Sequence, residues 1–111
     1  MIRYKPYIPK TVGEVMDQLG MMMLKSPTFR DDFYVGKNVE TVFSALNEGL
    51  ENIRKKLGEE QFQALKTLSA RMQAHFEADP EDSTGEASAG RQLIHEMEDI
   101  LRSTYRKRTP S

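Results

Sequence analysis

Apolar residues recur every three or four positions along most of this chain, which is the spacing of one buried face on an α-helix. The clearest stretch lies between Asn38, a favourable N-cap, and Gly58, a favourable helix stop. Its apolar face comprises Val39, Val42, Phe43, Leu46, Leu50, Ile53 and Leu57. The pattern therefore predicts one helix over residues 39–57.

Two helices are predicted before it. The first starts at a capping box opened by Thr11 and ends near Lys25, with apolar residues at helical spacing between them. A second, short helix is expected to carry Phe29 and Phe33, which are four positions apart, and to end at Gly36.

Two more helices are predicted after residue 58. One ends at Asp79, because the residue before a proline, here Pro80, disfavours the α-helical conformation. The last is expected to begin at a capping box of Ser83 and Glu86 and to run to residue 105.

These patterns predict an all-α fold, a compact antiparallel bundle of four to five helices, because no segment alternates apolar and polar residues as strands do. We expect three parts. Residues 1–10 form an extended basic arm, since they hold two prolines and three cations. Residues 11–105 form a single helical domain, and residues 106–111 form a flexible basic tail.

Composition narrows the class of protein. The chain has 111 residues, enough for one domain, and no cysteine, which excludes disulfides, thiolate metal sites and thiol nucleophiles. It has neither an apolar run of membrane-spanning length nor the apolar segment of a secretory signal. We therefore expect a cytoplasmic protein without membrane contact.

Charge is distributed unevenly behind a formal net charge of −1. Eight carboxylates fall between residues 77 and 99, against one lysine or arginine, Arg91. They belong to Glu77, Asp79, Glu81, Asp82, Glu86, Glu96, Glu98 and Asp99. Such a cluster attracts basic partners and repels nucleic acid. The residues predicted to bind a partner are Glu77, Asp79, Glu81, Asp82, Glu86, Glu96 and Asp99.

Candidate chemistry is sparse. The two histidines, His75 and His95, lack a compact metal-ligand spacing such as H-E-x-x-H, so no metal site is predicted. No pattern combines a serine nucleophile with a base, and no acid falls on a buried stripe where its pKa would be raised. We therefore expect neither an enzyme nor a cofactor or small-molecule substrate.

The basic C-terminal end is open to two interpretations. Arg102, Tyr105 and residues 106–108 could bind phosphates and stack a base. Alternatively, the cations offset the helix macrodipole. The second interpretation is favoured, because the acids that precede the tail would repel a nucleic-acid backbone.

The chain from Leu19 to Leu101 resembles small all-helical immunity proteins of bacterial contact-dependent growth inhibition systems. The segments that carry the resemblance are LKSPTFRDDFYVGKNV, GLENIRKKLG, FEADPEDSTGEASAGR and LIHEMEDIL. The resemblance implies a cytosolic protein that binds the toxic C-terminal domain of its cognate effector, often a nuclease, and blocks the active site. The alternative is a helical adaptor or regulatory subunit that binds another protein.

Overall fold

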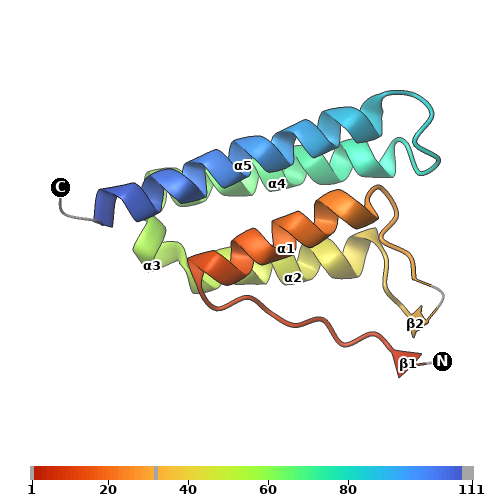
Figure 1. Ribbon diagram of the computed structural model, residues 1–111, viewed down its shortest axis with the longest axis horizontal. Coiled ribbons are helices and arrows are strands. Elements are labelled where there is room, and N and C mark those ends of the chain that lie inside the picture. Colours follow the sequence, from red (N-terminus) through yellow and green to blue (C-terminus); the bar gives the residue numbers. More distant parts are fainter. Residues whose placement is uncertain (1, 32, 109–111) are drawn as a thin grey trace.

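Helices make up most of the structure, a computed structural model that describes the backbone over residues 2–31 and 33–108 and the side chains up to Thr104. The elements in chain order are β1 (Ile2–Arg3), α1 (Val12–Lys25), β2 (Tyr34–Val35), α2 (Val39–Asn52), α3 (Arg54–Leu57), α4 (Glu59–Glu77) and α5 (Glu86–Arg108) (Figure 1). The four long helices form an antiparallel bundle, so the predicted fold class is confirmed. No described helix has both the length and the apolar content that a membrane span needs.

Caps fix where the first helices begin. The Asn38 side chain accepts the N–H of Thr41, and the Thr41 hydroxyl accepts the N–H of Asn38, which makes a capping box at the start of α2. At α1, the Thr11 hydroxyl accepts the N–H of Glu14. The Glu14 carboxylate reaches one residue beyond the expected box and accepts the N–H of Lys10.

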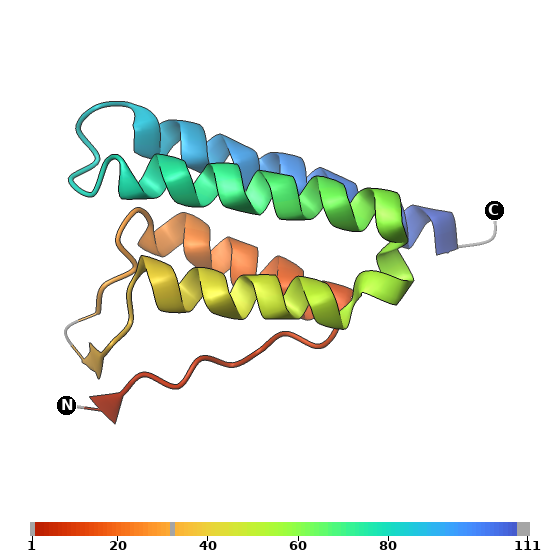
Figure 2. The same ribbon diagram turned by 180° about the vertical axis from the view of Figure 1, so that it is seen from behind.

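A single buried cluster joins all five helices. Helices α4 and α5 share the most extensive interface, and both views show them side by side above the α1–α2 pair (Figures 1 and 2). They approach closely at Gly90, where an added Cβ would lie 2.7 Å from the Phe76 ring. Phe76 also contacts the edges or faces of Phe29 and Phe43, with ring centroids 5.5 and 6.2 Å away.

The helix expected over residues 39–57 is divided in two. At Ile53 the backbone leaves helical geometry, with φ of −104° and ψ of 8°, and α3 begins immediately afterwards. The turn allows both Ile53 and Leu57 to be buried, at 1% and 7% exposure. Periodicity continues across this bend, which is why the sequence pattern predicted one helix.

The prediction of a short helix around Phe29 and Phe33 is wrong, because the described residues between 28 and 38 contain no helix. Phe29 has a positive φ of 59° and is fully buried between Phe43 and Phe76. Burying a phenylalanine side chain contributes about 2–3 kcal/mol. A left-handed backbone costs about 1–2 kcal/mol, so burial outweighs local helix formation here.

Residues after Phe29 instead form β2, which pairs in parallel with β1. This strand pair was not predicted, because its two halves are about 30 residues apart in the sequence and each has two residues. From β1 the chain runs along the bundle to α1, as Figure 1 shows. Pro9 packs against Gly49, and its carbonyl accepts the side-chain N–H of Asn52 at 2.8 Å.

Helix α5 extends to Arg108, three residues beyond the predicted end of the last helix at residue 105, while the flexibility of residues 106–108 stays a prediction. Helical hydrogen bonding continues without a break past Tyr105, the predicted end. Residues 109–111, the remainder of the predicted tail, lie outside the described residues.

Candidate interaction surface at one end of the bundle

Asp79, predicted to bind a partner, is buried, with 1% of its surface exposed. Its Oδ1 accepts the N–H groups of Ser83 and Thr84 at 2.8 and 3.2 Å, and its Oδ2 accepts that of Ala87 at 3.0 Å. The bond from Ala87, followed by those from Ser83 and Thr84, lowers the pKa of this carboxyl. Asp79 therefore organises the loop and the first turn of α5, and its carboxylate is not offered to a partner.

The capping box expected from Ser83 and Glu86 does not form. The Glu86 carboxylate turns instead to α4, where its Oε2 lies 2.5 Å from Nδ1 of His75. The reason is that the Asp79 carboxylate already accepts the N–H groups of the loop, including that of Ser83. Glu86 consequently links the end of α4 to the start of α5.

Asp82 also forms an ion pair within the chain. Its two carboxylate oxygens each lie 3.0 Å from Nη2 of Arg91, whose side chain is 23% exposed. Nη1 of Arg91 donates to the Ser26 hydroxyl at 3.2 Å, so this guanidinium ties the α4–α5 loop and α5 to the end of α1. The pair neutralises much of the Asp82 charge towards an approaching partner.

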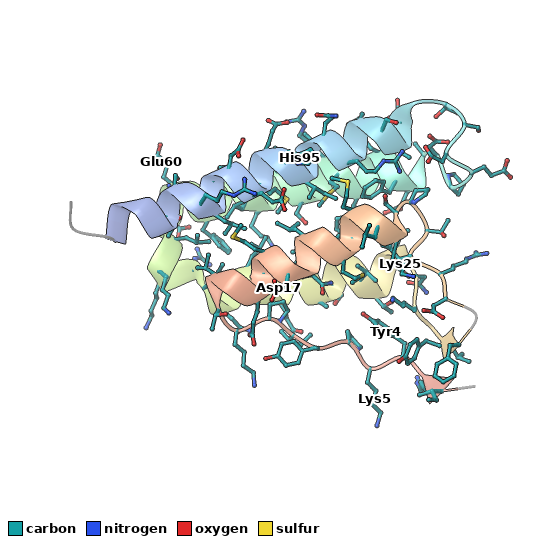
Figure 3. The ribbon with its side chains drawn as sticks, viewed as in Figure 1. Tyr4, Lys5, Asp17, Lys25, Glu60 and His95 are labelled. Carbon is teal, nitrogen blue, oxygen red and sulfur yellow. The ribbon has the colours of Figure 1, made fainter. Side chains whose placement is uncertain are left out.

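The predicted acids on α5 lie apart from the loop. Glu96 is ten residues beyond the start of α5, which corresponds to about 15 Å along the axis. Asp99 is further along and pairs with Arg102 at 3.1 Å, as its spacing indicates. Glu98 pairs with His95 at 3.3 Å rather than with Arg102. His95 is exposed at the top of α5 in Figure 3.

Among the described side chains, Glu77 at the end of α4 and Glu81 in the loop have no ion-pair partner. Glu77 borders a cavity of about 370 Å³ between the α1–α2 connection and the α4–α5 loop. Glu40, from the first turn of α2, borders the same cavity, and Pro80, next to Glu81, also lines it. We call Glu40, Glu77 and Glu81 the acidic end.

Other residues that line this cavity reduce its negative charge and its polarity. Val39 and Pro80 supply apolar wall, and Arg30 contributes a cation. Glu40 and Arg30 were not singled out from the sequence, because they lie more than 35 residues before Glu77 and reach it only through the packing of the bundle. No sequence pattern of fixed spacing relates them.

The strand pair lies at the same end of the bundle (Figure 1), and apolar side chains on and next to it are exposed. They are Ile2, Phe33, Tyr34 and Val35, and we call them the apolar strand patch. The Phe33 and Tyr34 rings meet edge to face at 5.2 Å. The run of aromatic and β-branched residues at 33–35 was the available signal for a strand. The spacing of Phe29 and Phe33, which is typical of a helix, competes with this signal in the sequence.

Two further features of the described part of the chain concern metal binding and a second cavity. Within that part of the chain, no three His, Asp or Glu side chains gather closely enough to hold a metal ion. A second cavity of about 270 Å³ lies between the arm and α1 and is lined in part by Gln18, whose amide nitrogen is buried without a hydrogen-bond partner.

This end of the bundle thus has carboxylates around a cavity and exposed apolar side chains at the strand pair. Comparison with known proteins adds no assignment, since no family model, no curated protein and no solved structure matches this chain.

Proposed function

We propose that this chain is a cytoplasmic immunity protein that uses its acidic end to bind and neutralise a cognate bacterial toxin domain with a basic active site, such as a nuclease. The observation that carries the proposal is the convergence of Glu40 and Glu77 at one cavity, with Glu81 following its lining residue Pro80. None of the three has an ion-pair partner among the described side chains. The residues come from two helices and a loop. Folding therefore gathers charge that the sequence separates.

The physical basis is electrostatic competition. A nuclease binds phosphates in a channel lined with lysine and arginine. Carboxylates presented at the mouth of that channel form charge-assisted hydrogen bonds with the same cations and so exclude the substrate. Opposite charges also accelerate the encounter, which suits an inhibitor that must act before the toxin does.

Asp82, Glu86 and Asp99 have a smaller role in this proposal than the sequence indicated. Each pairs with a cation or a histidine of the chain itself. Breaking such a pair to contact a partner would offset part of the gain. Glu96 remains an exposed acid on α5, beyond the acidic end.

Charge reversal at the two ends of α4 tests the proposal. Glu77→Lys combined with Glu81→Lys alters the acidic end, whereas Glu60→Lys alters the far end of the same helix, about 25 Å away (Figure 3). We expect the double variant to associate about tenfold more slowly with its cognate toxin domain, sought among the products of neighbouring genes, and to lose most of its salt dependence. Glu60→Lys should associate at nearly the wild-type rate.

Stopped-flow association rates at two salt concentrations provide the measurement, and rescue of growth in cells that express the toxin domain provides the biological readout. Equal rates for the double variant and the wild type would exclude the acidic end as the interface. A wild-type protein that neither binds nor rescues would exclude the immunity function and favour an adaptor for another protein.

A further inference from the structure

The apolar strand patch is unusual for the surface of this protein. Ile2, Phe33 and Val35 are 52%, 57% and 51% exposed, although the chain as a whole is polar, with a mean hydropathy of −0.63. Single exposed apolar residues are common on protein surfaces. A contiguous group of them at one site marks an interaction surface.

Both faces of the strand pair contribute to this patch. Ile2 is the register partner of Tyr34, and Arg3 is the partner of Val35, so consecutive positions place apolar side chains on opposite faces. A sheet of two short strands normally gains its stability by packing one face on a core. Here an apolar side chain remains exposed on each face, so the pair has surface left to bury on a partner.

Charges around the patch indicate what it would contact. Arg3 and Lys5 are exposed on and beside β1, and Lys5 points away from the helices in Figure 3. The ammonium group of Lys37 lies 5.7 Å from the centre of the Tyr4 ring, which in turn contacts Tyr34. Asp31, whose Oδ1 accepts the N–H of Phe33 at 2.9 Å, is a described carboxylate at the same border. The border therefore carries more cations than carboxylates among the described residues, and it complements a surface where carboxylates surround apolar side chains.

The strand pair and the α4–α5 loop lie at the same end of the bundle (Figures 1 and 2). The connection between α1 and α2 contains β2 and also lines the cavity of the acidic end, so it joins the patch to the acidic end. They have opposite charge. A partner that meets both must carry cations opposite Glu77 and Glu81 and carboxylates opposite Arg3 and Lys5. Such an arrangement fixes the orientation of the partner, because a reversed approach would place like charges together.

We propose that the apolar strand patch is the anchor of the interface with the toxin domain: it buries apolar side chains of the toxin that are bordered by carboxylates, while the acidic end orients the approach. The identity of the partner rests on the function proposed above. Apolar and aromatic anchors at the centre of an interface determine mainly the dissociation rate, whereas peripheral charges determine mainly the association rate.

The first experiment needs no toxin. Anilinonaphthalene sulfonate is an apolar anion and therefore a probe for exposed apolar surface with a cationic border. We expect the folded wild-type protein to bind it with increased fluorescence, and Phe33→Ser combined with Tyr34→Ser to reduce that signal at least fivefold. Leu24→Ser is the matched control, since Leu24 is 82% exposed on α1, outside the strand pair. Circular dichroism melts verify that each variant is folded.

The second experiment measures toxin-domain kinetics. The Phe33→Ser and Tyr34→Ser double variant should dissociate at least tenfold faster with little change in association rate, the reverse of the Glu77 and Glu81 variant. An unchanged dissociation rate, or a probe signal equal to that of the wild type, would overturn the proposed anchor. Wild-type dimers that the strand variant converts to monomers would also overturn it, because the patch would then bind a second copy of this chain. If no toxin domain binds, the immunity function fails while the probe still decides whether the patch exists.

Discussion

Asp79 shows at the level of one residue how an acid can be structural. Its carboxylate accepts three backbone N–H groups, and Asp79→Ala would leave those donors without this acceptor, that of Ala87 in a buried position. We expect this substitution to lower the melting temperature by about 10 °C. Glu81→Gln, which alters an exposed neighbour, should change it by no more than about 2 °C.

The same carboxylate predicts a pH dependence. Hydrogen bonds from Ala87, Ser83 and Thr84 lower its pKa from the ordinary value of 3.8. A group with a lowered pKa in the folded state stabilises the protein above its unfolded pKa and loses that contribution as the pH falls through the folded pKa. The melting temperatures of the wild type and Asp79→Asn should therefore converge below pH 3.8. A difference that stays constant from pH 7 to pH 3 would contradict this role.

Two glycines give a matched test at the level of helices. In α5, a Cβ at Gly90 would lie 2.7 and 2.9 Å from Phe76 ring atoms, whereas a Cβ at Gly20 in α1 would meet nothing within 4 Å. Gly90→Ala should destabilise the protein by about 1–3 kcal/mol, because α4 and α5 would have to separate. Gly20→Ala should stabilise it by about 0.5–1 kcal/mol through higher helix propensity. Urea unfolding measures both, and two changes of the same sign would contradict the proposed packing.

Elements differ in how far the sequence determines them. The long helices were predictable because their apolar period and caps, such as Asn38, are local signals. The segment after Lys25 was not, because Phe29 takes its conformation from burial against Phe43 and Phe76, which are distant in sequence. The bend at Ile53 and the pairing of β1 with β2 have the same origin. Tertiary packing overrides local preference at each of these places.

For the candidate surface, the sequence predicted the acidic loop but not which of its carboxylates remain without an ion-pair partner among the described side chains. Asp79 precedes a proline, which indicated a turn, yet its bond to Ala87 depends on how α5 returns along α4. Arg91 pairs with Asp82 while it also donates to Ser26 at the end of α1. Glu40 joins the surface from another helix. Charge along the chain therefore predicts a region, and only the fold shows which carboxylates a partner would meet.

At the scale of the whole molecule, one buried cluster links the helices, whereas the strand pair lies outside it. The core should therefore open only by global unfolding, and the strand pair should open locally. Amide hydrogen exchange can separate these modes. Gly90→Ala should accelerate exchange in α4 and α5 by about 5–150-fold, the factor equivalent to 1–3 kcal/mol. The N–H groups of Ile2 and Tyr4, which donate to Phe33 and Val35, should keep their wild-type rates. Equal acceleration at all these amides would mean that the strand pair unfolds only with the bundle, and that it is as rigid a platform for a partner as the helices are.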